Sequence, residues 1–251
     1  MLRIFFIIIT SSFIVANQEG YFGDWPVNPN KNEIENPGFG MDCQSDLKSA
    51  RCNCSTNDDC KSGECFSSPR SGQYCLQGAG TIFPQFKLMD QFGEEVDLYD
   101  FAGHGKLIVL EMSTAWCAPC QKLAAWLTDN DLAVTNHKWW KEEYNIIRDL
   151  VNDQKVFFIT IQVQDSYKTP SSLESLEDWY NMYPHEQIPL LADSDYGVRD
   201  WMRTSGYPTI IVLNDKMEIV QFSLRGWHDS FDLISSMNWK TKGDPLKEIN
   251  E

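Results

Sequence analysis

The distribution of cysteines constrains this chain more than any other feature of its sequence. Six of the eight cysteines fall between positions 43 and 75, and the other two form the C-x-x-C pair Cys117 and Cys120. Residues 43–80 are polar and carry few large apolar side chains, so burial alone cannot hold so short a segment together. Disulfides supply the missing constraint, each contributing about 2–4 kcal/mol. We therefore expect all six to be oxidised, with the pairing left open among Cys43, Cys52, Cys54, Cys60, Cys65 and Cys75.

The spacing of the same six cysteines disfavours a metal site. Structural zinc sites use pairs of thiolates in the form C-x-x-C. Neighbouring cysteines in this segment are 9, 2, 6, 5 and 10 positions apart, so that pair does not occur there. We interpret residues 43–80 as a small disulfide module.

The first residues have the pattern of a secretory signal peptide. A basic start, Met1–Arg3, is followed by apolar runs at 4–9 and 13–16. This apolar stretch is shorter than a membrane-spanning helix needs and is typical of a signal peptide cleaved near Ala16. An uncleaved N-terminal anchor is the alternative. Loss of residues 1–16 would give a secreted or periplasmic chain that is not attached to a membrane.

The composition changes along the rest of the chain. Residues 17–42 are rich in Asn, Pro and Gly, and their prolines exclude a long helix, so we expect a loose leader. Residues 81–239 alternate strand and helix patterns, which predicts an α/β domain with a mixed sheet covered on both faces. Residues 240–251 are expected to form a C-terminal tail. The expected strands cover 106–113, 155–163, 188–191, 209–213 and 218–224, and the expected helices cover 118–127, 137–151, 171–183, 196–203 and 230–237. Ser171 and Glu174 have the spacing of a capping box at the start of one helix.

The C-x-x-C pair lies between a strand and a helix, and this context gives it a chemical role. Cys117 would lie at the helix N-terminus, where unpaired backbone N–H groups and the helix dipole stabilise a thiolate. The thiolate is the nucleophilic form of cysteine. Pro119 suits the first helical turn, where its missing N–H costs nothing. Cys120 lies one turn further on, so the pattern predicts that Cys117 attacks a disulfide and Cys120 resolves it.

A longer pattern around the pair resembles thioredoxin-like thiol–disulfide oxidoreductases, in the redoxin branch that includes TlpA-type proteins. The matching residues begin at Phe83-Pro84-Gln85-Phe86, include 107–120 and Gly206-Tyr207-Pro208-Thr209, and end near Gly226. Trp-Cys-x-Pro-Cys after a strand, with Gly-x-Pro-Thr before a later strand, is the specific part of this pattern. The resemblance implies a thioredoxin-like mixed sheet flanked by helices, preceded here by the disulfide module.

The resemblance also implies roles for single residues. Cys117 would attack the substrate disulfide, and Cys120 would resolve the mixed disulfide. Trp116 would pack beside the pair and contact substrate. Pro208 would follow a cis peptide bond opposite the pair, which would leave the backbone of Tyr207 free to bind substrate.

Glu111 is the candidate proton acceptor. It lies six residues before Cys117, where the thioredoxin pattern has a buried acid. Strand alternation places positions 111 and 113 on one face. A desolvated carboxyl has a raised pKa and can take the proton of Cys120. A salt-bridged or edge-exposed side chain is the alternative for Glu111.

The charge balance limits the class of partner. The chain carries 21 basic and 36 acidic residues, a formal net charge of −15. This argues against nucleic acid and anionic membrane surfaces, because both require clustered Lys and Arg. The expected partners are proteins with thiols or disulfides, and a redox partner protein or a small thiol. No cofactor is expected, and the direction of exchange stays open.

Three other functions compete with disulfide exchange. Thr114-Ala-Trp-Cys117 fits half of a peroxiredoxin motif, although Leu110 stands where that motif has proline. Cys117 and Cys120 could instead bind copper(I) as thiolates. A non-catalytic interaction protein could bind through its cysteine-rich segment. The candidate third copper ligands are His104, His137, His185 and His228.

Overall fold

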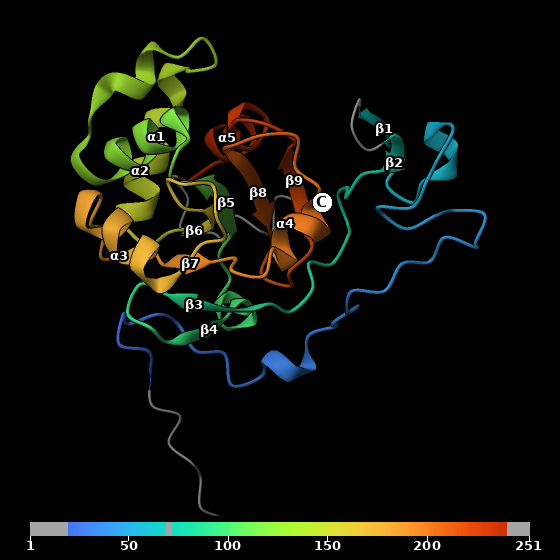
Figure 1. Ribbon diagram of the computed structural model, residues 1–251, viewed down its shortest axis with the longest axis horizontal. Coiled ribbons are helices and arrows are strands. Elements are labelled where there is room, and N and C mark those ends of the chain that lie inside the picture. The colour runs from blue at the N-terminus through green and yellow to red at the C-terminus, as the bar shows by residue number, and fades with distance from the viewer. Residues whose placement is uncertain (1–19, 69–71, 240–251) are drawn as a thin grey trace, which may run out of the picture.

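The computed structural model describes residues 20–68 and 72–239, and the elements within these residues form a small hairpin beside a larger α/β domain (Figure 1). Residues 1–16, for which we expect a signal peptide, and the expected tail 240–251 lie outside the described residues. No helix in the described part of the chain has the length and apolar character needed to cross a membrane.

A seven-stranded mixed sheet forms the centre of the domain. Its strand order is β4-β3-β7-β6-β5-β8-β9, in which β5, β6 and β7 run parallel and the outer strands pair antiparallel. The strands are β3 (Lys87–Asp90), β4 (Glu95–Asp97), β5 (Ile108–Thr114), β6 (Phe157–Gln164), β7 (Leu190–Ala192), β8 (Thr209–Leu213) and β9 (Ile219–Ser223). The apolar runs of β5 and β6 are buried on both faces, as is usual for parallel strands under helices. Five of the strands agree with the sequence prediction, which did not include β3 and β4.

Helices cover both faces of this sheet. The helices are α1 (Ala118–Asp129), α2 (Asn145–Asn152), α3 (Leu173–Met182), α4 (Gly197–Met202) and α5 (His228–Ser236). On one face, side chains of α1, α2 and α5 pack against Val109 of β5 and Val212 of β8. On the other face, α4 and the short 3-10 helix η3 (Leu98–Phe101) pack against Leu110 and Met112 of β5. The odd-numbered residues of β5 therefore face α1, which follows directly from strand alternation.

Two predicted helix starts are wrong. The helix expected over 137–151 begins only at Asn145, because the rings of His137 and Trp140 pack against Trp227. The helix expected from Ser171 is capped by Ser172, whose hydroxyl accepts from the backbone N of Ser175 at 3.3 Å.

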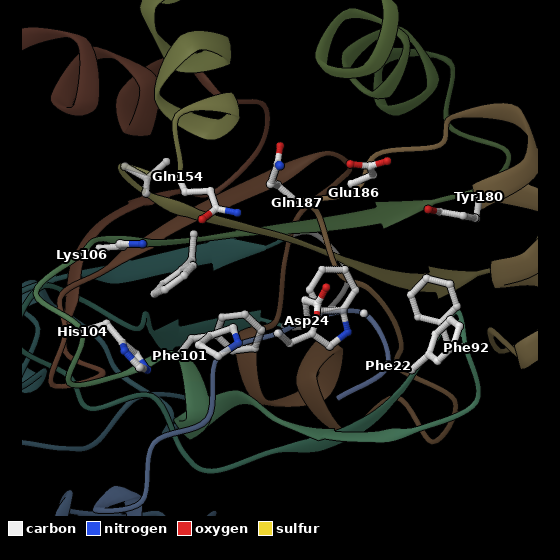
Figure 2. Close-up of a pocket in the computed structure, with 15 residues that line it drawn as sticks. Phe22, Asp24, Phe92, Phe101, His104, Lys106, Gln154, Tyr180, Glu186 and Gln187 are labelled. Atoms are coloured by element: carbon white, nitrogen blue, oxygen red, sulfur yellow. The ribbon is translucent and has the colours of Figure 1, made fainter. Parts of the chain in front are cut away.

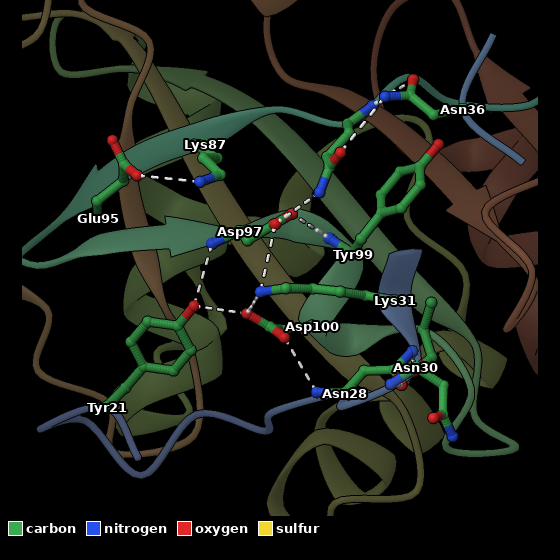
Figure 3. A network of polar contacts seen from close by, with 12 residues as sticks. Tyr21, Asn28, Asn30, Lys31, Asn36, Lys87, Glu95, Asp97, Tyr99 and Asp100 are labelled. Carbon is green, nitrogen blue, oxygen red and sulfur yellow. Dashed lines mark hydrogen bonds and ion pairs between the residues drawn. The ribbon is translucent and has the colours of Figure 1, made fainter. Parts of the chain in front are cut away.

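Residues 20–34 of the leader that we expected to be loose are packed against the domain. Trp25 is buried in the core, and its indole Nε1 donates to Asp90 at 2.8 Å. Lys31 lies 2.7 Å from Asp100 and 3.3 Å from Asp97 (Figure 3). The hydroxyl of Tyr21 donates to Asp100 at 2.6 Å and accepts from the backbone N of Asp97 at 3.3 Å. We call residues 20–34 the N-terminal strap. The pattern of apolar residues could not predict its packing, because its partners include two buried carboxylates, Asp97 and Asp100.

The disulfide module lies beside α4. Its bonds join Cys43 to Cys52, Cys54 to Cys65, and Cys60 to Cys75, which confirms that all six cysteines are oxidised. The module contains the hairpin of β1 (Cys65–Ser68) and β2 (Gly72–Cys75). The Tyr74 hydroxyl donates to the backbone O of Arg203 at 3.2 Å, and the Arg203 guanidinium lies 4.9 Å from the centre of the Tyr74 ring.

The linker after the module pairs with the sheet. Gly80 N donates to Ile219 O and Ile219 N donates to Thr81 O, each at 2.8 Å. The linker therefore continues the sheet beyond β9 before the chain enters the domain.

Candidate active site

The C-x-x-C pair lies at the N-terminus of α1, directly after β5. Cys117 is the N-cap residue, and its sulfur accepts from the backbone N of Cys120 at 3.3 Å. The two sulfurs form a disulfide with a Cα–Cα distance of 5.3 Å. Both cysteines are buried, with 4% of Cys117 and 0% of Cys120 exposed, so what little surface the pair presents belongs to Cys117. The backbone N–H at the helix start also favours negative charge on the Cys117 sulfur after reduction.

The cis-proline loop lies against this pair. The Tyr207–Pro208 peptide bond is cis, as the sequence analysis expected. Pro208 immediately precedes β8, which pairs with β5, and Tyr207 packs on the cluster that contains both cysteines. The backbone N of Gly226 donates to the carbonyl of Pro208 at 2.6 Å, which fixes the loop from its other side.

Trp116 forms an exposed wall beside the pair. Its side chain is 41% exposed, and its ring meets that of Tyr207 edge to face at a centroid distance of 6.1 Å. Its indole Nε1 donates to Gln164 Oε1 at 3.1 Å. The structure thus brings Trp116, Cys117 and Tyr207 to one end of the sheet.

Glu111 is fully buried on the face of β5 that carries α1. Burial raises its pKa from 4.5 to about 8, and a hydrogen bond from Thr160 opposes the rise. The Thr160 hydroxyl donates to one carboxyl oxygen at 3.0 Å, and the other has no hydrogen-bond partner in the described part of the chain. No positive charge contributes to this pKa. A proton acceptor with this pKa changes charge close to neutral pH.

Sequence reasoning missed Thr160. It lies directly opposite Glu111 in the parallel pairing of β5 with β6. Thr160 also borders a cavity of about 20 Å³ between α1 and α3 that His185 helps to line. This volume has room for about one water molecule. Aligning the two predicted parallel strands would have placed Thr160 next to Glu111.

A larger cavity lies away from the cysteine pair. It has a volume of about 580 Å³, and its wall is formed by residues at the beginnings of β5 and β6 and by the N-terminal strap (Figure 2). The cysteine pair follows the opposite end of β5, so this cavity takes no part in the chemistry of the pair. The described residues contain one cluster of three possible metal ligands, Cys54, Cys60 and Cys75, whose sulfurs are engaged in disulfides.

Two features together decide the fold: parallel strands β5 and β6 joined through α1 and paired with the antiparallel strand β8, and a C-x-x-C pair at the start of that helix. The fold is thioredoxin-like. The disulfide module and the N-terminal strap precede this thioredoxin-like domain, which spans β3 to α5.

Comparisons with known proteins give matches only among solved structures. No protein-family model matches the chain, and no curated protein matches its sequence. Among solved structures, the chain is similar to the thioredoxin domain of a thiol–disulfide oxidoreductase from Bacteroides vulgatus. The two sequences are 22% identical, the match covers 62% of this chain and 95% of that chain, and the TM-score is 0.43. It is also similar to a secreted disulfide oxidoreductase from Mycobacterium tuberculosis, with 18% identity, coverages of 60% and 92%, and a TM-score of 0.42. An exposed lipoprotein thioredoxin from Streptococcus pneumoniae has 17% identity, coverages of 66% and 98%, and a TM-score of 0.41.

Proposed function

We propose that this protein is an extracytoplasmic thiol–disulfide oxidoreductase that exchanges disulfides with protein substrates through Cys117 and Cys120. The observation that carries the proposal is the difference in exposure within the pair. Cys117 caps the helix and keeps 4% of its surface exposed, whereas Cys120, in the first turn, keeps none. This asymmetry separates an attacking thiol from a resolving thiol.

The exchange proceeds in two displacements. In the reduced protein, the Cys117 thiolate attacks one sulfur of the substrate disulfide, and the other substrate sulfur leaves as a thiolate. Cys120 then transfers its proton to the Glu111 carboxylate, and its thiolate attacks the Cys117 sulfur of the mixed disulfide. The second substrate thiolate leaves, so two electrons pass to the substrate and Cys117–Cys120 becomes oxidised. The same steps in reverse oxidise a dithiol.

The positions of the surrounding residues support these roles. The Glu111 side chain lies on the face of β5 beneath α1, the helix that carries Cys120. Tyr207 packs on the cluster that contains Cys117, and the exposed Trp116 contacts Tyr207, so a bound substrate chain would lie against these two side chains. The Tyr207 backbone, next to Pro208, is the group that we assign to hydrogen bonding with that chain.

The cellular location is part of the proposal. Three disulfides outside the redox pair are typical of proteins that fold in oxidising compartments. The sequence pattern of residues 1–16 is that of an export signal. Both indicate a protein that acts outside the cytoplasm.

Single cysteine variants test the assignment. Reduced protein is mixed with a fluorogenic peptide that contains an internal disulfide, with dithiothreitol as electron donor. Cys117→Ser should abolish catalysed exchange, because no exposed nucleophile remains. In a separate reaction without dithiothreitol, which would reduce the product, pre-reduced Cys120→Ser should accumulate a mixed disulfide with the peptide, detectable by mass spectrometry, because attack survives and resolution does not. Faster alkylation of Cys120 than of Cys117 in the reduced wild type would reverse the assignment.

A further inference from the structure

Two tryptophan–lysine pairs border the cis-proline loop. The Lys168 ammonium lies 5.2 Å from the centre of the Trp116 ring, and Trp116 contacts Tyr207. The Lys138 ammonium lies 5.2 Å from the centre of the Trp139 ring. Each pair presents an aromatic ring together with a positive charge.

Trp139 reaches this loop from the segment between α1 and α2. A Cβ atom placed on Gly226 would lie 2.7 Å from the Trp139 ring, so the ring rests directly on Gly226. Gly226 in turn donates its N–H to Pro208. Trp116 therefore touches the loop at Tyr207, while Trp139 touches the residue that anchors Pro208.

A third cation, Arg225, lies against the same loop. Its Nε would be 3.1 Å from a Cβ atom on Gly206, which is adjacent to Tyr207. Together Trp116, Trp139, Lys138, Lys168 and Arg225 form what we call the rim. Its members come from four different loops: before α1, between α1 and α2, after β6, and after β9.

The rim cations lack carboxylate partners. None of the three has a carboxylate oxygen within 4.0 Å in the part of the chain that the structure describes, although the chain carries a net charge of −15. Two acids close in sequence to the rim cations have partners of their own: Asp165 accepts from Thr169 at 2.5 Å, and Asp229 lies 3.5 Å from His228. Burial and the positive charges of Lys138 and Lys122 lower the pKa of His137, which fits a locally positive surface.

We propose that the rim binds acidic polypeptide segments that flank the reacting cysteine of the substrate. This inference rests on the proposed function and specifies its substrate class. A chain lying across Pro208 would extend toward Lys168 on one side and Lys138 on the other, so acidic residues on both sides of its cysteine find a cation. The tryptophan faces would cover the apolar stems of those side chains and exclude water from the ion pairs.

The test compares three disulfide substrates with dithiothreitol as donor. The first is a peptide with Asp and Glu on both sides of its disulfide cysteines, and the second is the same peptide with Asn and Gln. The third is oxidised glutathione, a small anionic disulfide. One exposed charge pair changes affinity about two- to threefold, so kcat/KM should be about tenfold higher for the acidic peptide than for its amide counterpart. The ratio should fall toward one in high salt.

Variants of the rim lysines test whether the preference for the acidic peptide arises at the rim. The double variant Lys138→Gln/Lys168→Gln should lower the acidic-to-amide ratio about fivefold, and Lys138→Glu/Lys168→Glu should bring it below one. The control Lys155→Gln/Lys216→Gln removes the same charge from the opposite end of the sheet and should leave the ratio as in the wild type. An equal loss of oxidised glutathione reduction would show that the rim attracts any anion, which would overturn the inference of a polypeptide.

The outcomes separate this inference from the proposed function. If both peptides are exchanged with nearly equal kcat/KM, the proposed role of the rim is wrong and the proposed oxidoreductase activity still holds. Absence of exchange with every substrate would overturn the oxidoreductase. The rim would then be judged by fluorescence anisotropy with labelled peptides whose cysteines are replaced by serine. Tighter binding of the acidic peptide, lost in Lys138→Gln/Lys168→Gln, would support the rim, and equal binding of both peptides would overturn it.

Discussion

Replacement of Glu111 by Gln tests whether the buried Glu111 carboxyl titrates with a raised pKa. Gln has nearly the same shape and keeps an oxygen that can accept from Thr160, but it does not titrate. The fully buried Glu111 carboxyl has a pKa of about 8, compared with its ordinary value of 4.5. Any pH dependence in the difference between wild type and Glu111→Gln therefore reports this one group.

The direction in which the free energy of unfolding changes with pH follows from proton binding. Between pH 4.5 and about 8 the folded chain holds a proton on Glu111 that the unfolded chain has released. The free energy of unfolding of the wild type therefore falls as pH rises through this window, and the loss is complete above it. At 1.36 kcal/mol per pH unit, the difference between the two pKa values corresponds to about 5 kcal/mol.

Urea unfolding of the oxidised protein at pH 5, 7 and 9 measures this effect. Relative to the wild type, Glu111→Gln should gain several kcal/mol of stability between pH 5 and pH 9, with an upper limit of about 5 kcal/mol. Glu95→Gln, at an exposed ion pair with Lys87, serves as the control and should change stability by at most about 1 kcal/mol. A stability difference for Glu111→Gln that stays constant from pH 5 to pH 9 would refute a buried, titrating carboxyl.

Further variants test the surroundings of the site and of the strap. Thr160→Val removes the hydrogen bond that lowers the pKa of Glu111, so the pH midpoint of the resolving step should move upward in stopped-flow exchange measurements. Gly226→Ala should cost about 1–3 kcal/mol in urea unfolding, because the residue has φ +84° and its new methyl meets the Trp139 ring; an unchanged midpoint would contradict that contact. Lys31→Met leaves two buried carboxylates without their cation and should cost about 3 kcal/mol, with faster amide exchange over the strap; unaltered exchange there would contradict a clamping role.

Much of the domain could be predicted because its strands follow simple rules. The run that became β5 is apolar and β-branched, and its alternation predicts that Glu111 and Ser113 share one face of the sheet. The helix start at Cys117 followed from the combination of strand, C-x-x-C and proline. Local patterns suffice where burial and backbone geometry point to the same structure.

The missed features depend on contacts between segments that are distant in sequence. Trp25 belongs to a segment rich in Asn, Pro and Gly, yet its partner Asp90 lies 65 residues away. The late start of α2 reflects packing of the rings before it against Trp227, and this tertiary contact overrides helical periodicity. The pairing of the six module cysteines is likewise a three-dimensional property, because spacing alone allows several connectivities.

The strap and the linker also determine how the sheet meets other molecules. An open sheet has two edge strands whose unpaired N–H and C=O groups can recruit strands from other chains, a route to aggregation. Here the Tyr21 hydroxyl accepts from Asp97 N on β4, and Gly80 and Thr81 pair with Ile219 on β9. Both protecting segments precede the thioredoxin-like domain in the chain. A fragment trimmed to begin at Phe83 would keep the redox pair and lose both the strap and the linker. It should therefore aggregate more readily than the full chain while it keeps its disulfide-exchange activity.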